Sequence, residues 1–119
     1  MAEGGLYIAV FSLQAQRWIQ VGRLGRFEFA PGFYFYVGSA QGNLAARLAR
    51  HGRREKALRW HVDYLSTEAT MIGAMIVPGS REGECTLAAQ LGRLYGLAVP
   101  RFGASDCRCG GHLFYASAL

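Results

Sequence analysis

This chain of 119 residues has no long apolar run, only three cysteines and a single lysine, and each shortage narrows the classes of protein to which it can belong. Without an apolar run near the roughly 20 residues that cross a bilayer, a membrane-spanning helix is excluded. The opening stretch MAEGGLY lacks the basic and apolar segments of an export signal, which predicts a cytoplasmic protein without membrane contacts. Three cysteines are an odd count, so a disulfide framework is not predicted.

The whole chain, residues 1–119, has the size and composition of one globular domain. Strand-length apolar or alternating runs occupy residues 5–12, 17–22, 32–38, 71–77 and 112–117. Helical periodicity occupies residues 44–52, 57–66 and 84–96, with Asn43 as a cap and Gly52 as a stop for the first of them. Because strands and helices come in blocks, we expect an α+β fold with a mostly antiparallel central sheet flanked by helices.

Charge is concentrated in one segment. The net charge is +5, and twelve of the thirteen basic residues are arginine, whose planar fork suits phosphate groups. Six of the thirteen lie in RLARHGRREKALR, opposed there only by Glu55. This pattern predicts contact with nucleic acid, with DNA as the expected partner. We assign five basic residues of this segment to that contact: Arg50, Arg53, Arg54, Lys56 and Arg59.

Helical spacing separates two of the basic residues from the others. Arg47 and His51 share a face with Leu44 and Leu48, so both should point inward. A half-buried arginine requires an anion, which is either an internal carboxylate or a bound phosphate. Glu84 opens the last predicted helix, in line with its apolar stripe of Leu87, Leu91, Leu94 and Tyr95. It therefore either caps that helix and pairs with Arg47, or serves the site.

Five short motifs follow one another along the chain: Gly5-Leu6-Tyr7, Tyr36-Val37-Gly38, the adjoining Ser39, Arg47-Leu48 and Glu84. Their order and spacing resemble those of the GIY-YIG nuclease superfamily. The stretches WHVDYL, GECTLA and FGASDCRCGGHLFY are similar to a compact branch of that superfamily, catalogued as a domain of unknown function (DUF123-like). Members of this branch occur alone or attached to a DNA-repair glycosylase, so a DNA-repair protein is a second candidate partner.

The resemblance implies a metal-dependent endonuclease that hydrolyses phosphodiester bonds. Glu84 would hold one Mg²⁺ or Mn²⁺ ion, Arg47 would contact the phosphate, and Tyr7 would take the proton from water. Tyr36 would complete the site, with Tyr34 as an alternative on the same strand face. Ser39 is assigned to the nucleic-acid-binding surface.

One feature of the superfamily pattern is missing. Many members have a catalytic asparagine after a proline-containing turn, and the stretch 100–103 has none. The polar candidates to replace it are His51, His61, Asp63, Asp106 and His112. We expect His51 first, because its helical position points it toward Arg47. For His61 and Asp63 a helix start with an internal pair is favoured. The missing asparagine also supports an alternative function, that of an inactive DNA-binding or repair-protein interaction module.

The cysteines leave two interpretations open. Cys107, Cys109 and His112, with Cys85 as a fourth ligand, could form a tetrahedral zinc site. Because the two close cysteines are separated by only one residue, we favour buried thiols or a disulfide from Cys85 to one of the others.

Overall fold

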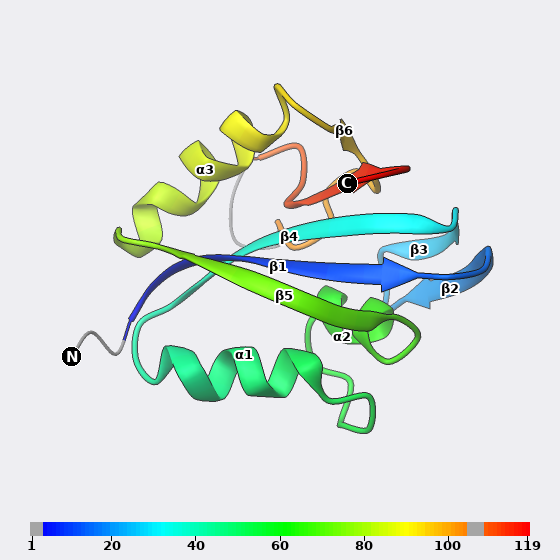
Figure 1. Ribbon diagram of the computed structural model, residues 1–119, viewed down its shortest axis with the longest axis horizontal. Coiled ribbons are helices and arrows are strands. Elements are labelled where there is room, and N and C mark those ends of the chain that lie inside the picture. The colour runs from blue at the N-terminus through cyan, green and yellow to red at the C-terminus, as the bar shows by residue number, and fades with distance from the viewer. Residues whose placement is uncertain (1–3, 105–108) are drawn as a thin grey trace.

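The computed structural model describes residues 4–104 and 109–119 and places a five-stranded antiparallel sheet at the centre (Figure 1). The strand order is β5-β1-β4-β7-β6. The strands are β1 (Gly5–Leu13), β4 (Gly32–Ala40), β5 (Thr70–Val77), β6 (Gly96–Leu97) and β7 (Leu113–Ala116). This arrangement confirms the predicted α+β class and the antiparallel sheet.

Strands β1 and β4 are apolar along most of their length because both of their faces are covered. On β1, Tyr7, Ala9 and Phe11 belong to the core under α1 (Leu44–Gly52) and α2 (His61–Ser66). Ile8 points the other way, into the core with Ala88 and Leu91 of α3 (Glu84–Leu91), which follows the short 3₁₀ helix η1 (Arg81–Gly83). Figure 1 shows α1 and α2 on one side of the sheet and α3 on the other.

A second, two-stranded sheet was expected only in part. β2 (Arg17–Val21) matches a predicted strand, and it pairs with β3 (Gly25–Phe29), which lies between two of the predicted strands and is not itself predicted. The alternation of Phe27 and Phe29 with Arg26 and Glu28 gives β3 a period of two, with Phe29 fully buried. Charged residues and the glycine at its start obscured this alternation.

Helix α1 has the bounds that the sequence predicts. The side chain of Asn43, in the left-handed region at φ 51°, accepts a hydrogen bond from the Ala46 N–H at 3.2 Å. The other two helices are shorter than expected. α2 begins at His61 rather than at residue 57, because Trp60 is extended and the Asp63 carboxylate binds its N–H. α3 ends at Leu91, so Leu94 is 74% exposed and does not continue the apolar stripe. Within the described ranges, no helix is both long and apolar enough to cross a membrane.

Candidate active site

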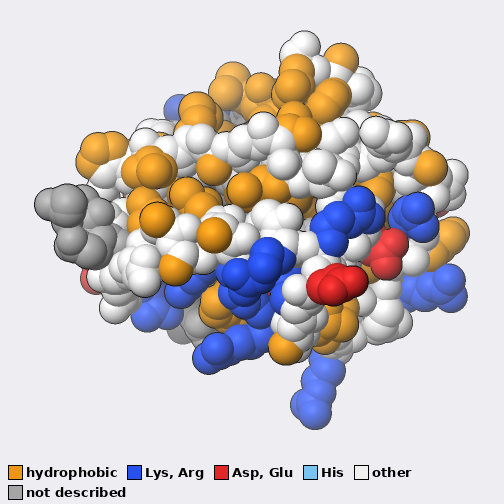
Figure 2. All heavy atoms as spheres, turned by 60° about the horizontal axis from the view of Figure 1, so that its bottom comes forward, with side chains coloured by type: hydrophobic (Ala, Val, Ile, Leu, Met, Phe, Trp, Pro, Cys, Tyr) orange, Lys and Arg blue, Asp and Glu red, His pale blue; other side chains and the backbone are white. Residues whose placement is uncertain are grey.

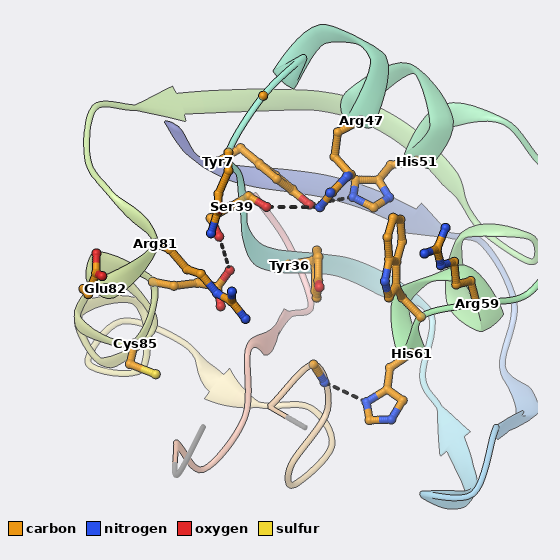
Figure 3. A pocket seen from close by; sticks show the side chains of 15 residues that line it. Tyr7, Tyr36, Ser39, Arg47, His51, Arg59, His61, Arg81, Glu82 and Cys85 are labelled. Carbon is orange, nitrogen blue, oxygen red and sulfur yellow. Dashed lines mark hydrogen bonds between the residues drawn. The ribbon is translucent and has the colours of Figure 1, made fainter. Parts of the chain in front are cut away.

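A cavity of about 880 Å³ opens between the α1 side of the sheet and the start of α3 (Figure 3). Its lining includes all five residues that the sequence predicts to be catalytic, and these come from four elements. They are Tyr7 of β1, Tyr36 of β4, Arg47 and His51 of α1, and Glu84 of α3. Residues that lie up to 77 positions apart in the sequence therefore share one site (84 − 7).

Tyr7 and His51 form a buried pair. The hydroxyl of Tyr7 lies 2.7 Å from Nε2 of His51, and each residue is 1% exposed. Burial raises the pKa of Tyr7 to about 12, although the neighbouring Arg47 opposes this shift. Burial also lowers the pKa of His51 to about 4, with Lys56 acting in the same direction. At neutral pH the pair is a phenol and an uncharged imidazole, so the hydroxyl can donate to Nε2.

Space for the Tyr7 ring comes from the strand beside it. Tyr7 is paired across the sheet with Gly38 of β4. A Cβ atom built at Gly38 would lie 2.5 Å from both Cζ and Oη of Tyr7. The glycine of the second motif is therefore required by the tyrosine of the first.

The tyrosines of β4 have different surroundings. The Tyr36 ring lies 6.3 Å from the Tyr7 ring and 5.8 Å from the His51 ring, and burial raises its pKa strongly. Tyr34 does not line this cavity. Its hydroxyl donates to the carbonyl of Ala30 at 2.6 Å, which gives Tyr34 a structural role.

Arg47 is half-buried and has no carboxylate partner among the described residues. Its Nη1 donates to the carbonyl of Ser39 at 3.1 Å, and its guanidinium lies 4.5 Å from the centre of the Trp60 ring. The guanidinium groups of Arg50 and Arg59 lie 4.4 and 5.4 Å from the same ring. The carboxylate of Glu84 contacts Ser39 and His112 instead of Arg47, so the guanidinium charge is available to a phosphate.

Glu84 stands at the first position of α3 without capping it. Its Oε2 accepts a hydrogen bond of 2.8 Å from the Ser39 hydroxyl, and its side chain is 23% exposed (Figure 3). Its Oε1 lies 3.6 Å from Nδ1 of the buried His112. Burial lowers the pKa of His112, only partly opposed by Glu84, so the imidazole is uncharged at neutral pH. The carboxylate is therefore oriented by Ser39 and keeps one face toward the cavity.

The arginine-rich segment divides into internal and exposed cations. Arg50, which the sequence assigns to the nucleic-acid contact, binds both oxygens of buried Asp63, at 2.7 and 3.0 Å. Asp63 also accepts the N–H groups of Arg59 and Trp60, as expected for a helix start with an internal pair. Lys56 donates to the carbonyls of Arg50 and His51, which close α1. Three arginines of the segment remain exposed, and these are Arg53, Arg54 and Arg59.

Several lining residues received no role from the sequence, among them Trp60, Arg81 and Glu82. Trp60 supports the guanidinium groups described above, while Arg81 and Glu82 of η1 also line the cavity. Trp60 belongs to the stretch WHVDYL, but an indole in such a stretch indicates packing as readily as a functional site. Nothing in the local sequence distinguishes Arg81 from a surface arginine.

The turn that lacks an asparagine reaches the cavity through Gly103. The Gly103 N–H donates to Nδ1 of His61 at 2.9 Å, and both residues line the wall. His61 thus joins the turn to α2. Asp106, another candidate, lies outside the described residues.

Sulfur atoms border the same cavity. Cys85 lines the wall one residue after Glu84, and it forms a disulfide with Cys109. This is one of the two arrangements that the sequence left open. Cys107 lies outside the described residues.

Comparison with known proteins assigns the chain to a family but to no activity. A family model described as "Domain of unknown function DUF123" matches residues 6–119. No curated protein and no solved structure matches. The predicted family is thereby confirmed, while its link to GIY-YIG nucleases stays a prediction.

Proposed function

We propose that this chain, which belongs to the family of the domain of unknown function DUF123, is a metal-dependent endonuclease that hydrolyses phosphodiester bonds of nucleic acid. The observation that carries this proposal is the convergence of Tyr7, Arg47, His51 and Glu84 on one cavity. Together they offer a proton acceptor, a cation for phosphate and a carboxylate for a metal ion.

The donor set around Glu84 is suited to Mg²⁺ or Mn²⁺. A magnesium ion is commonly held by one or two carboxylates, with waters and substrate phosphate oxygens completing its coordination. Glu84 provides such a carboxylate, oriented by the Ser39 hydroxyl and partly open to the cavity. The ion, when bound, supplies charge neutralisation at the phosphoryl oxygens and favours ionisation of water.

Arg47 holds the phosphate in this proposal. It is fixed from one side by the Ser39 carbonyl and by the Trp60 ring, so little freedom is lost when it binds an anion. A guanidinium aimed at the phosphoryl oxygens stabilises the charge that develops on them during hydrolysis.

Tyr7 and His51 move the proton. Water gives a proton to Oη of Tyr7 while the phenolic proton passes to Nε2 of His51, 2.7 Å away. With its pKa near 12, Tyr7 is not a phenolate in the free protein, so the partner imidazole is needed to accept this proton. An arriving phosphate places negative charge near His51, which raises the pKa of that imidazole and favours the transfer.

A panel of substrates tests the proposal. Supercoiled, branched and single-stranded DNA and RNA are incubated with the protein, with Mg²⁺, with Mn²⁺ or with a chelator. We expect cleavage of at least one DNA substrate that requires the divalent ion. Binding without cleavage of any substrate would contradict the nuclease and favour the alternative, an inactive binding module. The high pKa of Tyr7 in the free protein is the observation in favour of that alternative.

A further inference from the structure

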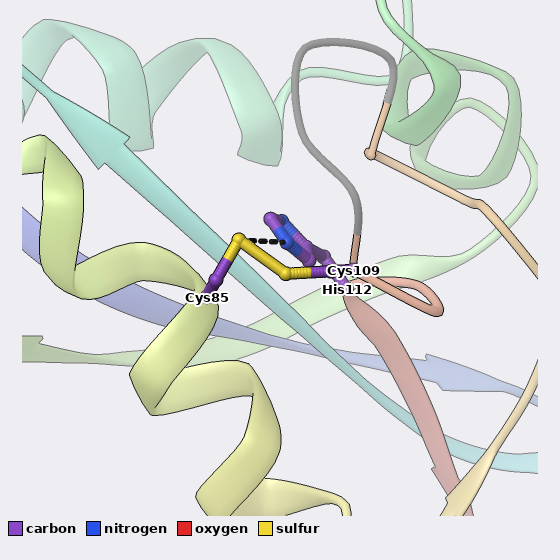
Figure 4. Close-up of side chains that lie close together, drawn as sticks. All are labelled: Cys85, Cys109 and His112. Atoms are coloured by element: carbon purple, nitrogen blue, oxygen red, sulfur yellow. Dashed lines mark hydrogen bonds between the residues drawn. A yellow bond between two sulfur atoms is a disulfide. The ribbon is translucent and has the colours of Figure 1, made fainter.

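Cys85, Cys109 and His112 form a compact cluster to which the proposed nuclease chemistry gives no role (Figure 4). Cys85 lies in the first turn of α3, and the other two residues lie in the segment that leads into β7. One sulfur or nitrogen atom from each residue lies within 4.8 Å of the other two. His112 is 1% exposed, whereas both cysteines are partly accessible.

We propose that this cluster, with its disulfide reduced, is a binding site for a zinc ion. Two sulfurs and an imidazole nitrogen are the donor types that zinc prefers. Two thiolates and one neutral imidazole also balance the charge of Zn²⁺. The disulfide and the metal use the same sulfur atoms, so the two states exclude each other.

One of the three ligand–ligand distances already matches a tetrahedral site. With Zn–S near 2.3 Å and Zn–N near 2.0 Å, tetrahedral angles place a sulfur about 3.5 Å from the nitrogen ligand. Nε2 of His112 lies 3.7 Å from Sγ of Cys85. After reduction the two sulfurs need a separation of about 3.8 Å, which rotation of two partly exposed side chains can provide.

The opposite nitrogen of His112 supports the same assignment. A histidine that binds zinc through one nitrogen usually donates its other N–H to a carboxylate, which fixes the ring. Nδ1 of His112 lies 3.6 Å from Oε1 of Glu84.

The fourth position is left to water or to a donor beyond these three residues. Metal binding here does not depend on the proposed nuclease activity, since none of the three ligands takes part in that reaction. The test therefore measures binding only and stands whatever the cleavage experiments show.

Metal titration of the reduced, metal-free chain is the direct experiment. We expect about one Co²⁺ per chain, with the strong visible bands of a tetrahedral site and a sulfur-to-cobalt charge-transfer band, both lost when Zn²⁺ displaces it. The oxidised chain should bind neither ion. A folded, reduced chain without the charge-transfer band, or an oxidised chain that binds zinc equally well, would overturn the proposal.

Variants identify the ligands. Cys85→Ser, Cys109→Ser and His112→Ala should each weaken zinc binding by more than the roughly 10- to 100-fold cost of losing an outer-shell partner. His61→Ala is the control, because His61 lines the active-site cavity but lies outside the cluster. The zinc affinity of this variant should be unchanged. Cys107→Ser should also retain binding. Loss of zinc in that variant would overturn the assignment of these three ligands.

Discussion

Tyr7 fits into the interior because its cross-strand neighbour has no side chain. The first and second motifs are therefore one structural unit: the tyrosine supplies the hydroxyl, and Gly38 supplies the space that the ring occupies. The same hydroxyl is hydrogen-bonded to His51, so a small displacement of the ring would also break the proposed proton path.

Gly38→Ala should displace this ring. The added methyl group would meet Cζ and Oη of Tyr7 at 2.5 Å, and overpacking of this kind costs about 1–3 kcal/mol of unfolding free energy. We expect lower thermal stability together with loss of cleavage. Gly73→Ala on β5 is the matched control, since no atom lies within 4 Å of its added Cβ. Equal stability and activity of the two variants would show that the ring has space to move.

Protonation of His51 should make stability depend on pH. Its pKa falls from 6.5 in the unfolded chain to about 4 in the folded one, so the unfolded state binds more protons between these values. The free energy of unfolding is therefore highest above about pH 6.5 and falls as the pH drops toward 4. A pKa difference of about 2.5 corresponds to about 3 kcal/mol.

Urea unfolding between about pH 7 and about pH 4 measures this dependence. His51→Gln should flatten the decline, because the substituted side chain does not titrate. A residual decline is expected from His61 and His112, whose pKa values burial also lowers. An unchanged decline in the variant would mean that His51 titrates at its ordinary pKa.

At the scale of elements, the connection between α1 and α2 is organised by one buried ion pair. The side chain of Arg50 on α1 binds Asp63 near the start of α2. The same carboxylate accepts hydrogen bonds from the backbone N–H groups of Arg59 and Trp60. Trp60 is thereby placed beside the guanidinium of Arg47. This pair determines the shape of the cavity wall although neither of its members lines the cavity.

Asp63→Ala should destabilise the protein by about 3–5 kcal/mol, since it leaves the Arg50 charge without its partner and two N–H groups unpaired. Glu68→Ala is the control. Its pair with Arg17 has a separation of 3.7 Å and is about half exposed, so its loss should change stability by less than about 1 kcal/mol. Chemical denaturation compares the two. Similar effects would contradict the organising role of Asp63.

Local patterns predicted some elements and failed for others. The cap at Asn43 and the spacing of Leu44, Leu48 and His51 predicted α1 and its inner face, because these signals lie within one helix. The start of α2 depends on Asp63, which accepts the N–H groups of Arg59 and Trp60; hydrophobic periodicity does not contain this signal, so it extended the helix too far. The convergence of Tyr7 and Glu84 on one cavity followed from the resemblance, whereas the places of Trp60 and Arg81 required the tertiary structure.

At the scale of the whole molecule, positive charge gathers on one face. Figure 2 brings forward the side on which α1 and α2 cover the sheet, and shows Lys and Arg side chains there with few acidic ones among them. The cavity contains residues of α1, so this charge lies beside the proposed site. A basic surface next to a phosphate-binding cavity favours a polyanionic substrate over a small phosphate ester.

Replacement of Arg53 and Arg54 by alanine should weaken nucleic-acid binding and its dependence on salt. Both are exposed, unlike Arg50, and each phosphate contact contributes about 0.9 to the log–log slope on duplex DNA. The double variant should therefore lose about 1–2 from the slope in a titration of affinity against salt. Arg23→Ala with Arg93→Ala is the control, because both are exposed and lie outside the segment. Equal slopes would assign Arg53 and Arg54 to solubility.

The central claim is that Glu84 holds a metal ion for phosphodiester hydrolysis, and Glu84→Gln tests it most directly. The amide keeps the shape and can still accept a hydrogen bond from Ser39, but it lacks the charge that would hold the cation. Glu82→Gln is the matched control, since Glu82 lines the same cavity two residues earlier and has no role in the proposal. Cleavage rate and affinity in metal-free buffer are measured for both variants. The account predicts that Glu84→Gln lowers cleavage at least about 100-fold with unchanged affinity, and that Glu82→Gln retains both. Full activity of a folded Glu84→Gln variant would contradict it.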